Sequence, residues 1–473
     1  MQIKHAMAVV VAMCFGAAAQ ADLRDEALTA AKQATKFLHE QVSTEGGYLW
    51  RYSADLTKRE GEGVVTTKTV WTQPPGTPSV GQGFVRLYEA TGESVFRTAA
   101  RDAAEALRLG QMRSGGWQDR VEFEPDRRRK WAYRVDDKGR KDQSSLDDDK
   151  TQASLRFVMR LDRAIGFEDE VIHEMALYAL DGLITKGQYP NGGFPQVWTG
   201  DPRDPADYPI KPASYPDSWS REYTGHHNYW YRYTLNDNLA PDVVEALFLA
   251  ADIYGDRRYH DAALKVGGFL ILAQMPDPQP AWAQQYGYDM HPIWARKFEP
   301  ASITGGESQG VIKTLMMIYR RTGDRKYLAP IPKALDYLKR SELPDGRLAR
   351  FYELRTNKPL YFTRDYKLTY DDSDMPTHYS FKIFSKVDDL RRAYEKLVKL
   401  PVDQLKQGGE HTPRLTDKLQ RRVRHVIDAM DQRGAWVTDD GLRYHKQPGP
   451  VIDMRVAVKN LNVLAEYLAA SKP

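Results

Sequence analysis

The feature that most constrains the fold of this chain is a helical pattern that recurs along most of its length. An apolar helical stretch is followed by a glycine-centred turn, a second helix and a loop that joins glycine to an aromatic residue. The turns read "ATGESVF", "AIGFEDEV", "IYGDRRY" and "RTGDRKY", and the loops read "GGYLW", "SGGWQ", "NGGFPQVW" and, more weakly, "RGAW". Like elements recur at intervals of roughly 70 to 90 residues, which is typical of a repeat architecture. In each turn the glycine takes the place of a helix C-cap, and a charged residue begins the next helix.

Periodicity within these segments favours helices over strands. In "VFRTAARDAAEALRLG", Phe96, Ala100, Ala103 and Leu107 recur at spacings of three and four, and "PDVVEALFLAADIYG" repeats the pattern. Strand-like alternation is scarce. We therefore predict an all-α fold, an (α/α) toroid of repeated helical hairpins with a loop-built cleft and minor β-hairpins; an extended helical solenoid is the alternative. Residues 202–233, rich in Pro, Asp and Tyr, predict a long functional or capping loop.

The N-terminus predicts export. Lys4 and His5 precede the apolar run "AMAVVVAMCFGAA", which ends in small residues at "AQA". This pattern indicates a signal peptide over residues 1–21, and the run is too short to favour the alternative of a membrane anchor. We expect a periplasmic or secreted protein whose residues 22–473 form a single (α/α)-toroid domain. The only cysteine, Cys14, lies in the signal, so the mature chain would carry neither a disulfide nor a cysteine-bound metal.

Charge and composition narrow the classes of partner that the protein is expected to bind. The formal net charge of +4 is too small to indicate nucleic acid as a partner. Aromatic residues make up 11% of the chain, and exposed aromatic rings stack on sugar faces. We expect neither a nucleic-acid nor a membrane partner, and a monomer.

Two acidic segments precede predicted helices. Asp147, Asp148 and Asp149 stand in "SSLDDDKTQASLRF", and Asp237 stands in "TLNDNLAPDVVEAL". Carboxylates at a helix N-terminus cap free amides, which explains one aspartate better than three. Clustered hard oxygens also suit Ca²⁺, although EF-hand spacing is absent. Capping and cation binding both stay open for each segment.

Arginines surrounded by aromatic residues are the second kind of candidate. Arg350 and Arg364 are interleaved with aromatics in "GRLARFYELRTNKPLYFTRDYKLTY", and Arg296 stands in "HPIWARKFEPAS". Guanidinium groups match carboxylates and aromatic rings suit sugars, which favours an acidic glycan as ligand. An ordinary surface β-hairpin with scattered arginines is the alternative for the first segment.

The sequence lacks the motifs that are typical of several enzyme classes. The "GEG" and "VGQGF" segments lack the context of a nucleotide-binding turn, and no nucleophile-elbow serine is present. His226 and His227 are adjacent rather than spaced as zinc ligands. A glycoside hydrolase needs a facing pair of carboxylates, and with 64 acidic residues that class stays open.

Taken in order, the motifs resemble those of polysaccharide lyase family ten, pectate lyases with an (α/α) toroid. "SSLDDDKTQASLRF" is similar to the family's Ser-Thr-Ile-Asp-Asn-x-Ala-Thr-Thr-x-Leu-Arg-Phe block, and "QYPNGGFPQVW" to its Tyr-Pro-Asn-Gly-Gly-Trp-Pro-Gln segment. "TLNDNLA", "QPAWAQQYGYDMHPIWARKFEPASITGGES" and "ARFYELRTNKPLYFTRD" also have counterparts. The matches span about residues 144–380.

The resemblance implies a role for each candidate. Arg296 falls at the catalytic base, Asp148 and Asp237 at calcium positions, and substrate-binding positions are taken by Asp147, Arg350 and Arg364. The implied reaction is β-elimination in a pectate-like polyuronate, in which the C5 proton leaves and the C4 oxygen departs. Calcium and arginine would stabilise the enolate.

An arginine base is unusual because its pKa normally exceeds about 12. Burial among aromatics and a bound Ca²⁺ would both disfavour the cation, although desolvation alone would not deprotonate it fully. The base assignment therefore depends on the resemblance, whereas a role in binding negative charge follows from the chemistry of arginine.

The sequence also departs from the family pattern. Asp148 replaces an Asn, Lys150 replaces a small Ala and would compete with a cation or pair with Asp147, and Pro376 stands where a substrate-binding arginine is usual. Homogalacturonan is the expected polymer, and another uronate-containing glycan stays open. The alternatives in function are a toroidal glycoside hydrolase and a non-catalytic acidic-glycan-binding protein.

Overall fold

The computed structural model describes residues 22–136, 138–201, 203–405 and 413–472. The predicted signal peptide, with Cys14, lies outside these residues. In the described part of the chain no helix combines the length and the apolarity that crossing a membrane requires.

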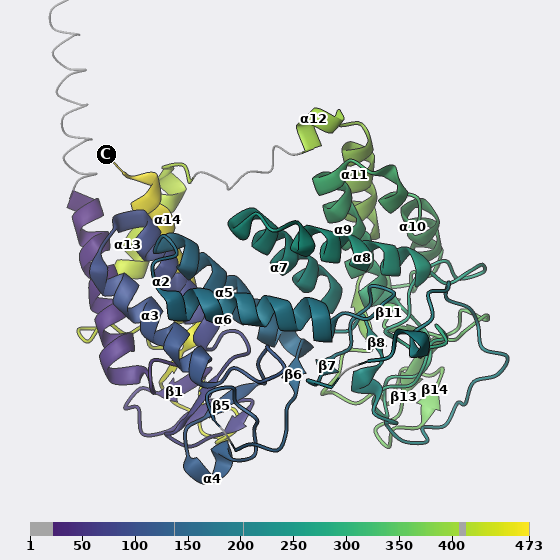
Figure 1. Cartoon of the computed structure of the whole chain (residues 1–473), viewed down its shortest axis with the longest axis horizontal. Coiled ribbons are helices and arrows are strands. Elements are labelled where there is room, and N and C mark those ends of the chain that lie inside the picture. The colour runs from purple at the N-terminus through teal and green to yellow at the C-terminus, as the bar shows by residue number, and fades with distance from the viewer. Residues whose placement is uncertain (1–21, 137, 202, 406–412, 473) are drawn as a thin grey trace, which may run out of the picture.

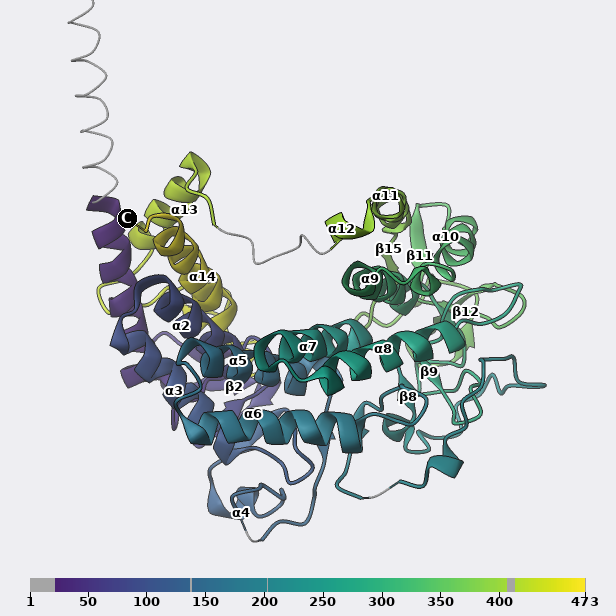
Figure 2. The same ribbon diagram turned by 45° about the horizontal axis from the view of Figure 1, so that its top comes forward.

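Helical hairpins build the molecule, each with an inner and an outer helix (Figures 1 and 2). The inner helices are α2 (Thr77–Thr91), α5 (Lys150–Ala164), α7 (Leu239–Tyr254), α9 (Gly305–Thr322), α11 (Val387–Val398) and α14 (Met454–Ala470). Their partners are α3 (Ser94–Leu109), α6 (Glu170–Gly182), α8 (Arg257–Leu272), α10 (Ile331–Arg340) and α13 (Asp417–Asp428). The shortest helices are α4 (Pro125–Arg128) and α12 (Val402–Leu405), and a further helix covers residues 22–37.

The inner helices pack in one continuous series, α14 on α2, then α5, α7, α9 and α11. Figures 1 and 2 show the two ends of this series, α14 and α11, standing apart on opposite sides of the molecule. The predicted all-α toroid with minor β-hairpins is therefore confirmed, in the form of an open ring.

The predicted turns end and begin these helices as the sequence indicates. Gly92, Gly255 and Gly323 adopt left-handed conformations with φ of 75°, 67° and 71° directly after α2, α7 and α9. Asp169 and Asp256 accept backbone hydrogen bonds at the starts of α6 and α8. The apolar stripe predicted for α3 is fully buried, which packs this outer helix against α2.

Short antiparallel sheets occupy the loop end. One sheet has the order β16 (Val451–Asp453), β1 (Arg51–Ser53), β2 (Arg59–Gly61), β3 (Gly63–Val64), and another the order β10 (Ile303–Thr304), β12 (Phe351–Tyr352), β13 (Pro359–Phe362), β14 (Leu368–Thr369). The pairs are β4 (Thr69–Trp71) with β5 (Arg120–Glu122), β6 (Ser144–Ser145) with β7 (Val197–Trp198), β8 (Tyr233–Thr234) with β9 (Gln285–Tyr286), and β11 (Arg347–Ala349) with β15 (Lys382–Phe384). Single-turn helices are η1 (Leu38–Val42), η2 (Asp147–Asp149), η3 (Leu183–Gly187), η4 (Pro205–Asp207), η5 (Tyr229–Tyr231) and η6 (Arg325–Tyr327).

Candidate active site

The two acidic segments occupy equivalent places in neighbouring hairpins. Asp148 and Asp149 have φ of 47° and 63° directly before α5, and Asp237 and Asn238 have φ of 52° and 57° directly before α7. Left-handed backbone is uncommon for residues other than glycine and costs free energy, so it is retained where the surroundings require it. Because α5 packs on α7, the two distorted turns face each other.

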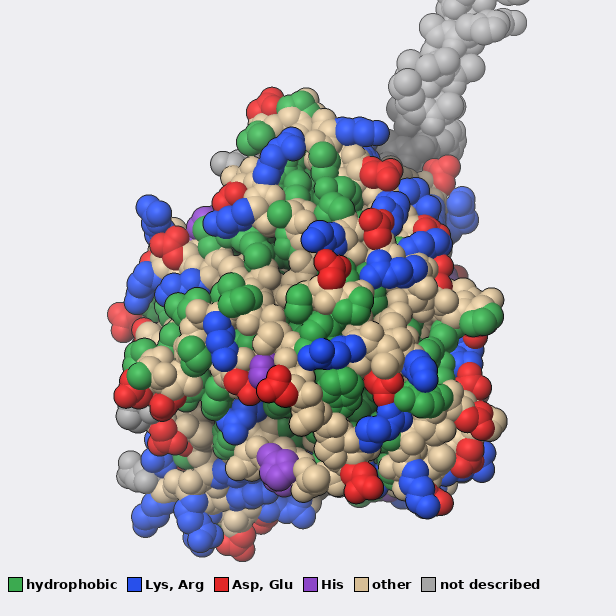
Figure 3. Space-filling model, turned by 90° about the vertical axis from the view of Figure 1, so that its right-hand side faces the viewer, with side chains coloured by type: hydrophobic (Ala, Val, Ile, Leu, Met, Phe, Trp, Pro, Cys, Tyr) green, Lys and Arg blue, Asp and Glu red, His purple; other side chains and the backbone are tan. Residues whose placement is uncertain are grey.

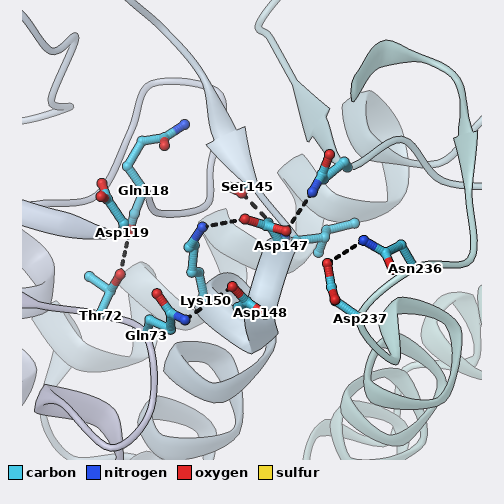
Figure 4. A network of polar contacts seen from close by, with 12 residues as sticks. Thr72, Gln73, Gln118, Asp119, Ser145, Asp147, Asp148, Lys150, Asn236 and Asp237 are labelled. Atoms are coloured by element: carbon cyan, nitrogen blue, oxygen red, sulfur yellow. Dashed lines mark hydrogen bonds and ion pairs between the residues drawn. The ribbon is translucent and has the colours of Figure 1, made fainter. Parts of the chain in front are cut away.

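These turns bring Asp147, Asp148 and Asp237 together (Figure 4). One carboxylate oxygen from each of the three lies within 4.8 Å of the other two. Lys150, which is 7% exposed, donates from Nζ to Asp147 Oδ2 at 2.7 Å. Of the two roles that the sequence left open for Lys150, the ion pair with Asp147 is the one observed.

Amide side chains complete the cluster. Each carboxylate of the cluster accepts one hydrogen bond from a neutral donor: Gln196 to Asp147, Gln73 to Asp148 and Asn236 to Asp237. Neutral donors orient carboxylates without cancelling their charge, so the cluster keeps most of its negative charge.

Asp149 has a separate role. Its carboxylate accepts two hydrogen bonds from Arg156 Nη2, at 2.7 and 2.5 Å. Neither Asp149 nor Asn238, the N-cap residues of α5 and α7, makes a side-chain cap hydrogen bond. Capping therefore does not account for these segments.

The pKa values of the three clustered aspartates follow from how unevenly their negative charges are compensated. Burial, followed by the charges of Asp147 and Asp148, raises the pKa of Asp237 to about 8. Burial and the charge of Asp147 also raise the pKa of Asp148. Burial acts to raise the pKa of Asp147 as well, but Lys150 and hydrogen bonds from Gln196 and Asp237 hold it below its ordinary value. A cluster of hard oxygens with too little positive charge fits a divalent cation such as Ca²⁺.

Arg296 is held by a buried carboxylate. Its Nε and Nη2 donate to Glu299 Oε2 and Oε1 at 2.7 and 2.5 Å, and Glu299 is 1% exposed. The hydroxyl of Tyr379 donates to Glu299 Oε1 at 3.0 Å. The guanidinium carbon lies 5.0 Å from the ring centre of Phe298 and 5.6 Å from that of Tyr379. Of the aromatic residues beside Arg296 in the sequence, Phe298 contacts it; Tyr379 and the Glu299 carboxylate are neighbours that the sequence did not reveal.

This carboxylate overturns the expected effect on the arginine. Burial acts to lower the pKa of Arg296, but the hydrogen bonds and charge of Glu299 outweigh it and raise that pKa above the ordinary value. The expected effect of burial on the cation is present, but the Glu299 carboxylate, which the sequence did not reveal as its partner, reverses the net direction. The positive charge of Arg296 also acts to lower the pKa of Asp148 and of Asp237, which places it beside the cluster.

Arg350 lies on the same side as Arg296. Its guanidinium carbon is 4.5 Å from the ring centre of Tyr379, and its Nη1 is 3.9 Å from Glu307 Oε1. Arg350 and Asp237 line one cavity of about 270 Å³. The structure thus brings together Arg296, Arg350 and the carboxylate cluster.

Arg364 lies elsewhere. It follows β13 in an exposed turn and pairs with Asp374 at 3.2 Å, and among the described residues no contact joins it to the cluster. Figure 3 shows the side of the molecule on which β13 and β14 lie, where acidic and basic side chains are interspersed. A role for Arg364 in substrate binding stays a prediction.

The predicted long loop, residues 202–233, contacts segments on the arginine side and on the carboxylate side of the site. Trp294 Nε1 donates to Ser220 O at 2.9 Å, and Gln143 Nε2 donates to the Tyr231 hydroxyl at 2.6 Å. Burial raises the pKa of Tyr229 to about 12; Arg296 opposes this rise, whereas Glu299 and Asp147 add to it. The Tyr229 hydroxyl of this loop is therefore influenced by the charges of both the arginine and the carboxylates.

Sequence reasoning missed several of these groups. Glu299 had a signal, because an acidic residue three positions after Arg296 is placed to pair with it. Gln196 stood in a quoted motif without being singled out. Gln73, Tyr229 and Tyr379 carried no local signal that separates them from other residues of their type.

Part of the chain is similar to a known protein family. The pectic acid lyase family model matches residues 111–318, which include Asp147, Asp148, Asp237 and Arg296. This match confirms the resemblance predicted from the motifs, begins earlier than the predicted region and ends before Arg350. It supports polysaccharide lyase activity. A search of curated proteins gave no significant match.

Solved structures similar to the chain include carbohydrate-active enzymes. A mutant family 10 polysaccharide lyase from Cellvibrio cellulosa, in complex with trigalaturonic acid, is 20% identical with a TM-score of 0.47, covering 67% of this chain and 98% of its own. A cellobiose 2-epimerase from Bacillus thermoamylovorans is 12% identical with a TM-score of 0.45, covering 91% and 95%. A family GH76 α-mannanase from Bacteroides thetaiotaomicron is 10% identical with a TM-score of 0.42, covering 94% and 95%.

Proposed function

We propose that this protein is a polysaccharide lyase that cleaves a pectate-like polyuronate, homogalacturonan in the first instance, by calcium-assisted β-elimination. The observation that carries the proposal is the cluster of Asp147, Asp148 and Asp237 beside Arg296, inside the segment that matches the pectic acid lyase family. A polyuronate chain brings a carboxylate on every residue, so a site for it must supply positive charge. Asp148 and Asp237 would hold a cation, and Arg296 and Arg350 are charged groups of the protein itself.

The chemistry requires stabilisation of an enolate. When the C5 proton leaves, negative charge develops on the uronate carboxyl group, and a bound Ca²⁺ would polarise that group. Arg296, fixed by Glu299, supplies a preorganised cation at the same place, which is the kind of group that lowers such barriers. Its role as the base that removes the proton is implied by the family resemblance, and the ion pair with Glu299 means that Arg296 starts as a cation.

The test is elimination itself. Purified protein is incubated with polygalacturonate in Ca²⁺ or in chelator, and ultraviolet absorbance of the unsaturated product is followed together with new reducing ends. We expect absorbance that depends on the cation. Reducing ends without absorbance would indicate a hydrolase, and no reaction on any polyuronate would rule out the lyase.

Arg296→Ala provides the second arm of this test. Loss of a preorganised charge at the reacting centre is expected to lower turnover by about 10³-fold or more while oligomer affinity changes far less. Turnover that survives in this variant would remove Arg296 from the catalytic role.

One observation favours a second candidate, a non-catalytic protein that binds acidic glycans. The Lys150 ammonium already pairs with Asp147, at a position where the family has a small residue. Binding of polygalacturonate with neither absorbance nor reducing ends would favour this candidate.

The remaining assignments belong to the same proposal. Export to the periplasm or the medium and a monomeric state fit an enzyme whose polymeric substrate lies outside the cell. Mass spectrometry of the mature N-terminus tests the cleavage predicted after Ala21, and light scattering tests the monomer.

A further inference from the structure

A second cavity, of about 550 Å³, opens beside the carboxylate cluster. Lys150 joins the two, because it lines this cavity and its ammonium donates to Asp147. Figure 4 shows two other lining residues, Gln118 and Asp119, on the far side of Lys150 from Asp237. The cavity therefore continues the line that runs from Asp237 through Asp147.

The basic run 127–130, in and just after α4, supplies the cations of this cavity. Arg127 and Lys130 line it, three residues apart. Among the described residues neither has a carboxylate within ion-pair distance, and both are exposed. The two arginines between them do not line the cavity and are paired: Arg128 with Asp136 at 2.7 Å and Arg129 with Asp126 at 3.5 Å.

The carboxylates that line the cavity do not serve these two cations. Asp119 pairs with Arg120 at 2.6 Å and Asp126 with Arg129 at 3.5 Å. Glu122 accepts from the neutral Thr69 hydroxyl at 2.8 Å and keeps its charge, but it forms an ion pair with neither cation. Lys150 is neutralised by Asp147. Arg127 and Lys130 are thus the lining cations left to meet an external anion.

An aromatic ring lies beside them. Lys130 Nζ is 4.8 Å and Lys141 Nζ is 5.4 Å from the ring centre of Trp131, which also lines the cavity. Trp131 is only 8% exposed, so its ring holds these ammonium groups by cation–π contact, and the unpaired Lys130 is left to bind a carboxylate. The volume of the cavity, about 550 Å³, has room for a sugar residue, and its position beside the cluster favours a uronate of a bound chain over an inorganic anion.

We propose that this cavity is an additional subsite that binds a uronate residue of the same polysaccharide chain, with Arg127 and Lys130 holding its carboxylate. The subsite rests on the proposed function only in taking the ligand to be an acidic glycan. It serves a chain long enough to extend from the cluster past Lys150, so it contributes to affinity for long oligomers and not for the shortest ones.

The experiment is calorimetric titration with oligogalacturonates of increasing length, at fixed Ca²⁺, in an Arg296→Ala background. Arg127→Ala is compared with Arg97→Ala, which removes the same charge from an exposed position of α3 outside the cavity. We expect Arg127→Ala to weaken the binding of long oligomers by about 10-fold and Lys130→Ala by about 5-fold, in line with a charge-assisted hydrogen bond. The affinity of the shortest oligomer, and that of every oligomer in Arg97→Ala, should stay within about twofold of the parent.

Equal losses in Arg127→Ala and Arg97→Ala, or a loss independent of oligomer length, would overturn the subsite. Thermal unfolding of each variant controls for folding. The outcome is separable from the lyase proposal: a length-dependent loss without any elimination by the wild type keeps the subsite and discards the lyase. Elimination by the wild type, with unchanged long-oligomer binding in Arg127→Ala, keeps the lyase and discards the subsite.

Discussion

The two halves of the candidate site handle charge in opposite ways. On the carboxylate half, Asp147, Asp148 and Asp237 crowd together with one lysine for three acidic groups, and the pKa of Asp237 rises to about 8. On the arginine half, Arg296 is matched by a buried Glu299 that accepts two hydrogen bonds from it. The first half is incomplete without an added cation, whereas the second is already fixed in place.

This difference assigns the two halves different tasks. A site with excess negative charge binds and exchanges an ion, because the ion relieves repulsion between the carboxylates. A paired guanidinium with neutral aromatic neighbours keeps its position before and after substrate binds, which is what preorganised stabilisation of a transition state requires. Variants that alter one half only should therefore separate ion binding from turnover.

The largest effect is expected when the fixed half is loosened. Glu299→Gln keeps the shape of the side chain and removes its charge, so Arg296 loses its charged partner. We expect kcat on polygalacturonate to fall by about 10²-fold, since misplacement of a reacting group by about 1 Å has that cost, with little change in Ca²⁺ affinity. Stability should fall by about 1–3 kcal/mol, because the partner arginine still reaches water. Initial rates, calorimetry with Ca²⁺ and thermal unfolding measure the three quantities.

A pH profile makes this prediction specific. Removing the Glu299 charge lowers the pKa of Arg296, so a reaction limb that depends on Arg296 should move to lower pH in Glu299→Gln. An unshifted profile with reduced kcat would assign Glu299 a purely structural role.

The second prediction compares the two other arginines implied by the family. Arg350 shares Tyr379 with Arg296 and a cavity with Asp237, whereas Arg364 lies in an exposed turn. Arg350→Ala should raise KM for polygalacturonate by about 10-fold to 30-fold, in the range of a lost charge-assisted bond. Arg364→Ala should stay within about twofold, as for exposed ion pairs. Equal effects in the two variants would show that the cleft extends to the turn after β13.

The third prediction concerns the carboxylate half alone. Lys150→Met removes the ammonium from Asp147 and keeps the volume of the buried chain. Ca²⁺ should then bind about 10-fold more tightly, because the cluster gains one uncompensated charge at short range. Lys326→Met, at an exposed site paired with Asp324, is the matched control and should leave Ca²⁺ affinity unchanged. Weaker binding in Lys150→Met would mean that Lys150 orders the cluster rather than competing for it.

Local patterns made the fold predictable, and contacts between distant segments decided the site. The glycines at Gly92, Gly255 and Gly323 end helices because no side chain hinders their left-handed backbone, and such positions can be read residue by residue. The opening of the ring between α11 and α14 depends on how whole helices pack, which no short pattern encodes.

The same distinction holds within the site. Asp148 and Asp237 were separate candidates in the sequence, and their closeness depends on α5 packing against α7. Gln73 reaches Asp148 from 75 positions away without a local signal. The run Arg127–Lys130 was hidden by the mild net charge of +4, because a whole-chain sum cancels a local excess.

The smallest effect is expected from pH. The pKa of Asp237, about 8, is raised above that of an unfolded aspartate, about 4. The folded protein therefore holds this proton more tightly than the unfolded chain does, and stability contributed by the protonated carboxyl declines as pH rises from about 4 to 8. In chelator the midpoint of thermal unfolding should drop by a few degrees between pH 5.5 and 8.5. In a chain this long, each kcal/mol of lost stability lowers the midpoint by about 2 °C or less. Asp237→Asn should remove most of this drop, and Ca²⁺ should reverse it at pH 8.5 but not at pH 5.5, where the proton competes with the ion. A slope that persists in Asp237→Asn would place the proton on another group and would weaken the contrast between the two halves of the site.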